Sequence, residues 1–214
     1  MTREEFCKVH WEYYLVLERD FLATERYVSF ELGDNYLYTS ASVLNAENSL
    51  IYSNEYIKQY QAICSEVDVI MKSICKEFGN TSAEKMPDYT TDILQRWPNI
   101  KNQKVEMKDI ELQPFLNWNE TPYQAPDWWK PYNAVKHQRI DNYKNANLKN
   151  VLNALAGVYI LCNYFVKYIG DRDNTFDVPN DISHLFEMVN YTTREKVIGR
   201  NTYDIPTSDI YALF

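Results

Sequence analysis

The sequence predicts an all-α fold, a bundle of four to six helices with an irregular insertion that could be partly β between two long helical regions. Apolar residues recur at steps of three and four along residues 57–78 and again along 148–169. Only 5 glycines occur in 214 residues, which disfavours turn-rich β-sandwiches and glycine-rich phosphate loops. Because 45% of the chain is hydrophobic, it can bury one sizeable core, and we expect a single domain over residues 1–214.

The amino-terminal part, residues 1–79, is expected to hold two helices. Thr2 and Glu5 have the spacing of a capping box, so the first helix should begin there, and its apolar pattern continues to Leu32. Residues 36–52 fit either a short helix or an irregular packed loop.

The second helix has the strongest pattern in the chain. Ser53 is a good amino-terminal cap, and Gly79 permits the left-handed backbone that ends a helix. Between them lies a regular apolar seam of Ile57, Tyr60, Cys64, Val67, Met71, Ile74 and Phe78. A seam of this regularity requires a neighbouring helix or a second subunit.

Residues 80–127 contain several prolines and are expected to form an elaborate connection, with a short helix near 88–95 and a short strand near 104–107. Residues 128–170 return to helical periodicity, with a break expected around 141–145 and an end at Gly170. The two long helices are expected to pack antiparallel.

The carboxy-terminal part, residues 171–214, is expected to contain one short helix and a docked tail. The apolar positions that suggest this helix are Ile182, Leu185, Phe186 and Val189.

The cysteines and the hydropathy pattern indicate the cytoplasm. Cys7, Cys64, Cys75 and Cys162 are widely spaced and lie in apolar helical patterns, so they are expected to be small core residues. The polar first residues lack the apolar run of a signal peptide, and the run from 154 to 162 is shorter than a membrane span. We therefore expect no contact with a membrane.

The net charge of -8 argues against indiscriminate binding of nucleic acid over the whole surface. Residues 127–150 are an exception, because five basic side chains accompany only two acidic ones there. Such a cluster is either a solvated helix face or a local binding site for an anion.

The basic stretch contains the candidate site. On a helix, Asn133 and His137 share one face, with Lys136 beside them and Arg139 about two-thirds of a turn further on. An imidazole can transfer protons near neutral pH, and Lys or Arg can offset phosphate charge. The residue types therefore suit cleavage of a phosphodiester, with no metal or other cofactor expected.

The segment from Tyr132 to Arg139, followed by a long apolar helix, resembles the signature region of HEPN-like bacterial proteins. The usual motif of that superfamily is an Arg, four to six residues of which the first is polar, and then His. The resemblance implies a helical RNA-cleaving toxin or phage-defence protein. In such proteins His and Arg meet across a homodimer cleft, and the 2′-hydroxyl of RNA attacks without a metal.

Carried over to this chain, His137 matches the family His and Asn133 the polar position, whereas Tyr132 stands where Arg is expected. Lys130 or Arg139 would then supply the missing charge. Glu66, in the earlier long helix, could orient the His137 ring.

The alternative is a noncatalytic helical interaction protein that keeps the fold and dimer seam but lacks the catalytic Arg. In that interpretation His137 is a hydrogen-bonded interface residue and Asn133 a packing amide. Trp128 and Trp129 could stack on bases, but packing is favoured for both. The resemblance implies RNA as a partner. Together with the 18 tyrosines and the regular seam, it favours a second copy of the chain as well, and a further partner protein is the third expected partner.

Overall fold

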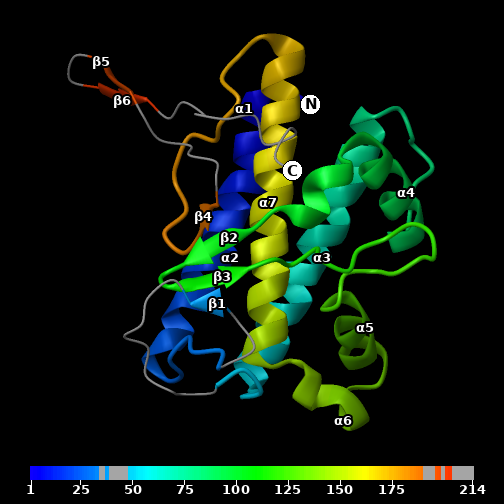
Figure 1. Cartoon of the computed structure of the whole chain (residues 1–214), viewed down its shortest axis with the longest axis vertical. Coiled ribbons are helices and arrows are strands. Elements are labelled where there is room, and N and C mark those ends of the chain that lie inside the picture. Colours follow the sequence, from blue (N-terminus) through cyan, green and yellow to red (C-terminus); the bar gives the residue numbers. More distant parts are fainter. Residues whose placement is uncertain (34–36, 39–47, 190–195, 199–200, 204–214) are drawn as a thin grey trace.

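The computed structural model describes residues 1–33, 37–38, 48–189, 196–198 and 201–203. Three long helical segments pack side by side as its core (Figure 1). The first comprises α1 (Arg3–Phe6), a π-helical turn (Cys7–Trp11), α2 (Glu12–Leu22) and a 3-10 turn (Ala23–Arg26). The other two are α3 (Asn54–Glu77) and α7 (Leu148–Asp173). The mainly helical class expected from periodicity is confirmed.

The two long helices α3 and α7 run parallel, so the expected antiparallel pairing is wrong. Their first turns lie together, where the Leu148 backbone N–H donates to the Ile51 carbonyl at 2.9 Å. Their last turns also lie together, where Phe78 packs against Tyr168 with ring centroids 5.2 Å apart. The intervening residues 78–147 return the chain to its starting end before α7 begins (Figure 1).

The first helical segment runs antiparallel to both of its neighbours. The Met1 amino group bonds to the Glu77 carboxylate at 2.6 Å, and the Phe6 ring packs edge-on against Phe165. Its capping box is present, because the Thr2 side chain accepts from the Glu5 N–H. The helix ends at Arg26 and not near Leu32, since residues 27–33 are not helical.

Helix α3 begins and ends where the sequence predicts. The Ser53 side chain accepts from the Tyr56 N–H at 3.0 Å, and Gly79 has a positive φ of 100°. All seam positions except Phe78 are buried. These buried side chains pack against α7 in the core.

A small antiparallel sheet lies against the helices, so the fold is not purely α. Its order is β1-β3-β2-β4, with β1 at Leu37–Tyr38, β2 at Val105–Met107, β3 at Ile110–Leu112 and β4 at Glu187–Met188. The hairpin of β2 and β3 is the β part expected in the insertion. The outer strands come from the distant parts of the chain that flank it. A separate hairpin joins β5 (Lys196–Ile198) to β6 (Asn201–Tyr203).

The segment before β4 is docked by a buried carboxylate and is not the short helix that was expected. Glu18 of α2 accepts from the backbone N–H groups of His184 and Leu185 at 2.9 and 3.2 Å. It also accepts from the Tyr14 and Ser183 hydroxyls. The chain then continues into β4 at Glu187–Met188, where the short helix was expected. The tail beyond residue 203 lies outside the described residues, as does most of the ambiguous segment 36–52.

The connection between α3 and α7 contains α4 (Met86–Arg96), a 3-10 turn (Pro98–Asn102), the β2–β3 hairpin, α5 (Trp129–His137), α6 (Arg139–Asn142) and a 3-10 turn (Tyr143–Asn145). A helix break is present in the expected region, where Tyr143–Asn145 form a 3-10 turn and α7 begins only after Asn147. A second break lies earlier, at Gln138, whose φ of -138° and ψ of 67° are not helical. Arg139 therefore does not continue the helix that carries His137.

Helix α7 is the innermost element. It is long and apolar enough to cross a membrane, but 89% of its most apolar stretch is buried within this structure. It passes Gly170, the expected end, and stops at Asn174 in the left-handed conformation. A Cβ at Gly170 would lie 2.6 Å from the Asp177 Cα, so this glycine permits close approach of the following loop. All four cysteines are buried and form no disulfide, as expected of core residues.

Candidate functional site

Helix α5 carries most of the candidate residues and is held against α3 by aromatic side chains. The Tyr60 hydroxyl of α3 donates to the Trp128 carbonyl at the start of α5, and the Trp128 indole N–H donates to the Pro114 carbonyl at 2.9 Å. Trp128 also packs against α7, since a Cβ at Gly157 would lie 3.0 Å from its ring. Packing, as favoured, is therefore the role of Trp128.

Tyr132 belongs to the buried face of α5. It is 6% exposed, and its ring packs against Tyr60 and Trp129 with centroids 5.8 and 5.1 Å apart. Burial raises the pKa of Tyr132 to about 12, so its hydroxyl is neutral at physiological pH. The side chain at the expected Arg position is therefore a packing residue that carries no charge.

Lys136 lies over the ring of Tyr132. Its ammonium lies 5.7 Å from the Tyr132 ring centroid, within range of a cation–π interaction. The lysine is exposed, so its charge stays in solvent above the buried ring. The fold thus places a cation over the position where the resemblance leads one to expect Arg.

His137 ends α5 on the surface. Its side chain is exposed, and within the described part of the chain no hydrogen bond, ion pair or ring contact involves it. Arg139 is also exposed but begins α6 after the break at Gln138. Lys136, His137 and Arg139 therefore form a solvent-facing group at the end of α5, which we call the α5 tip.

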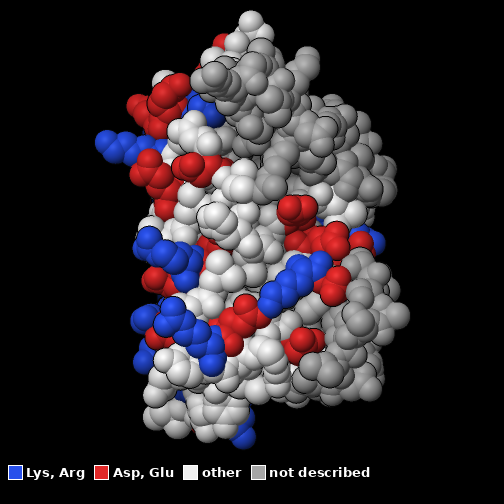
Figure 2. Space-filling view, turned by 90° about the vertical axis from the view of Figure 1, so that its left-hand side faces the viewer, with Lys and Arg blue, Asp and Glu red and all other residues white. Residues whose placement is uncertain are grey.

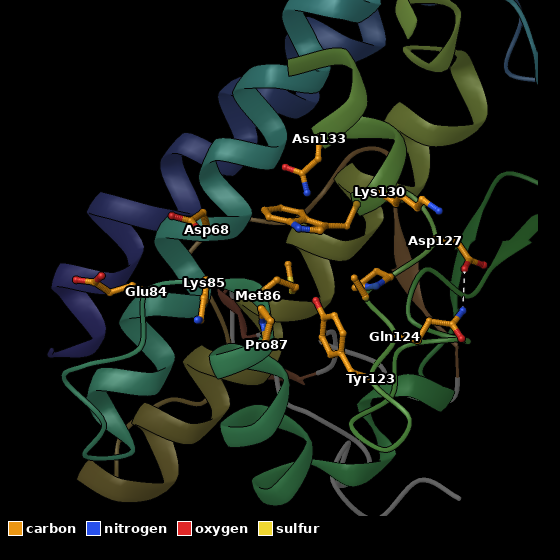
Figure 3. A pocket seen from close by; sticks show the side chains of 13 residues that line it. Asp68, Glu84, Lys85, Met86, Pro87, Tyr123, Gln124, Asp127, Lys130 and Asn133 are labelled. Atoms are coloured by element: carbon orange, nitrogen blue, oxygen red, sulfur yellow. Dashed lines mark hydrogen bonds between the residues drawn. The ribbon is translucent and has the colours of Figure 1, made fainter. Parts of the chain in front are cut away.

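Asn133 and Lys130 lie one turn or more before the tip and line a cleft of about 740 Å³. Its walls come from α3, the start of α4, the connection 123–127 and α5. Figure 3 shows Asn133 and Tyr123 pointing into the cleft from opposite sides, whereas Lys130 points outward. The polar candidates are thus divided between the cleft and the tip.

The lining of the cleft is mixed in charge. Three carboxylates and two ammonium groups contribute, from Asp68, Glu84, Asp127, Lys85 and Lys130. Two of the carboxylates already accept hydrogen bonds, Asp68 from the Tyr89 hydroxyl at 3.2 Å and Asp127 from the Asn117 amide at 2.8 Å. Among the residues that the structure describes, no group of His, Cys, Asp and Glu has the arrangement of a metal site.

Glu66 does not face His137. Its carboxylate bonds to the His10 Nδ1 at 2.9 Å, and both side chains are buried between the first helical segment, α3 and α7. The expected orientation of His137 by Glu66 is therefore wrong, since α5 packs on another face of α3. Glu66 and Asp68 point to different faces of α3, as expected from their spacing.

The sequence interpretation missed His10 as a partner for Glu66. His10 follows Phe6 by four residues and precedes Tyr14 by four, so its place on the apolar stripe was visible. It also missed Tyr123, which lies in the irregular connection and carries no periodic signal.

Comparison of the chain with protein-family models, with curated proteins and with solved structures gives no match. The HEPN-like resemblance consequently rests on the sequence alone, mainly on residues 53–78 and 128–170.

Proposed function

We propose that this chain is a HEPN-like RNA-binding protein that acts in bacterial defence or a toxin–antitoxin system, with His137 as the group that would cleave RNA. The observation that carries the proposal is the α5 tip, where an imidazole and two cations are exposed together and form no ion pair within the described structure. Cations that are not neutralised by neighbouring carboxylates are available to phosphate.

The charge distribution over the surface favours a local site. Figure 2 shows the opposite side of the molecule from α5, where basic and acidic side chains are interspersed over the described part. With a net charge of -8, the chain as a whole repels a polyanion. Binding would therefore depend on the few cations of the tip and be sensitive to salt.

The chemistry available at the tip is proton transfer. By the mechanism that the resemblance implies, the 2′-hydroxyl attacks the adjacent phosphorus, the bond to the 5′-oxygen breaks, and a 2′,3′-cyclic phosphate forms. One proton leaves the 2′-oxygen and one reaches the 5′-oxygen, and an exposed imidazole can carry out either transfer. Lys136 and Arg139 would offset the charge that develops on the phosphate.

A second copy of the chain would complete such a site, and we include self-association in the proposal. Ile140 of α6 directly follows the tip and is 90% exposed, and Leu50 nearby in the fold is 69% exposed. Tyr52 and Tyr143 join these regions through an edge-on ring contact at 5.2 Å. Exposed apolar side chains beside a candidate site are typical of interaction surfaces.

One observation favours the alternative, a noncatalytic interaction protein that uses the same surface. Tyr132 is built into the core at the position of the catalytic Arg, so the charge there comes only from Lys136 above its ring. In this alternative the tip binds RNA or a partner protein, and His137 has no catalytic task.

RNA binding is tested by fluorescence anisotropy with a labelled single-stranded RNA at several salt concentrations. The double variant Lys136→Ala/Arg139→Ala should bind more weakly, and the slope of log affinity against log salt should fall by about 0.7 for each phosphate that is no longer neutralised. A matched control, Lys8→Ala/Arg19→Ala, removes the same charge from exposed positions of the first helical segment. Equal effects of both double variants would show that only net charge matters, and absence of binding by the wild type would refute the proposal.

A further inference from the structure

The cleft beside the α5 tip differs from the tip in charge and in shape. The tip is cationic and open, whereas the cleft has more carboxylates than ammonium groups and a defined volume of about 740 Å³. That volume lies in the usual range for small-molecule sites. A phosphate would be repelled from the cleft and attracted to the tip, so the two places suit different parts of one ligand.

Aromatic groups form part of the cleft wall. Tyr123 is 49% exposed and points into the cleft (Figure 3). Trp129 lines the cleft and is 9% exposed, because its other contacts are with Trp128 and Tyr132 in the core. An aromatic ring that is fixed on one side and accessible on the other is a surface on which a planar group can stack.

A hydrogen-bonding group also points into the cleft. Asn133 directs its amide toward the cleft interior (Figure 3), and no hydrogen bond of this amide occurs within the described part of the chain. An amide offers both a donor and an acceptor.

From this division of charge and shape we propose that the cleft holds one unstacked base of single-stranded RNA, while the adjoining phosphates lie at the α5 tip. The base stacks on Tyr123, and the Asn133 amide bonds to its edge. This inference rests on the proposed function and names its substrate as single-stranded, because a base within a duplex cannot leave the stack without breaking its base pair.

The experiment compares a single-stranded RNA with a duplex of the same sequence, again by anisotropy. Tyr123→Ala should bind the single strand about 5- to 150-fold more weakly, the effect of removing one stacked ring, and bind the duplex as the wild type does. Tyr123→Phe, which keeps the ring, should bind the single strand as the wild type does. Asn133→Ala should weaken binding of the single strand only.

Tyr27→Ala is the matched control, because Tyr27 is 87% exposed and lies at the end of the first helical segment, away from the cleft. Circular dichroism verifies that each variant is folded. If Tyr123→Ala binds the single strand normally while Lys136→Ala/Arg139→Ala binds it weakly, the base site is refuted and RNA binding stands. If the wild type binds no RNA, the proposed function and the base site are both refuted.

Discussion

Replacing His137 with alanine should remove RNA cleavage and leave the fold intact. The His137 side chain is exposed and makes no hydrogen bond or ion pair within the described structure, so the substitution removes little packing. Substitutions at such surface positions usually change the free energy of unfolding by no more than about 0.5 kcal/mol.

The expected effect on cleavage is much larger. General acid–base catalysis by one side chain typically increases the rate about a hundredfold to ten-thousandfold.

Tyr132→Ala is the informative comparison, because the buried ring packs against both Tyr60 and Trp129. Its removal should lower the free energy of unfolding by about 3–5 kcal/mol. His137→Ala therefore tests the effect of the α5 tip on the rate of cleavage, whereas Tyr132→Ala tests the contribution of the buried face of α5 to stability.

The assay incubates purified wild type and His137→Ala with mixed cellular RNA in the presence of EDTA, and urea unfolding of the same samples measures stability. Cleavage by the wild type alone, with equal stabilities, is the expected result. Equal cleavage by both proteins, or none by the wild type, would favour the noncatalytic alternative. Unfolding of His137→Ala would contradict the structural argument, because it would mean that the side chain is packed.

Three further predictions concern assembly and stability. Ile140→Glu should dissociate a dimer that the wild type forms at about 100 μM in sedimentation velocity, and a monomeric wild type would remove the second copy from the proposal. Glu18→Ala should lower the free energy of unfolding by about 2–5 kcal/mol in urea titrations, because it leaves the Tyr14 hydroxyl and the His184 N–H without their acceptor. An unchanged midpoint would show that this segment is not docked through Glu18. Gly170→Ala should cost about 1–3 kcal/mol in the same titration, since its Cβ would lie 2.6 Å from the Asp177 Cα, and a neutral effect would mean that the loop can move away.

Local signals in the sequence identified the helices well. Capping at Thr2 and Ser53, the termination at Gly79 and the apolar seam of α3 depend on residues within a few positions of one another. Such interactions can be inferred from spacing alone because the helix itself fixes which residues are neighbours. The same reasoning placed Asn133 and His137 on α5 and made the four cysteines core residues.

The packing of segments that are far apart in the sequence could be determined only from the tertiary structure. The sequence does not show that residues 78–147 return the chain to its starting end, so the parallel pairing of α3 with α7 was not predictable from periodicity. Nor does it show that Glu18 captures the backbone of His184 and Leu185, which replaces a plausible helix with a docked segment. In both cases the deciding interactions join residues far apart in sequence.

For the candidate site, the sequence alone determined which residue types α5 carries, and only the tertiary structure decided which of them lie together. Packing of α5 on α3 buries Tyr132, turns Asn133 into the cleft and leaves His137 at the surface. Glu66 bonds to His10 because the first helical segment, and not α5, covers that face of α3. A helical repeat fixes which side chains share a face of the helix. Which neighbouring element covers each face depends on the packing of the whole chain. In this protein that packing places the cleft and the α5 tip at different positions along α5.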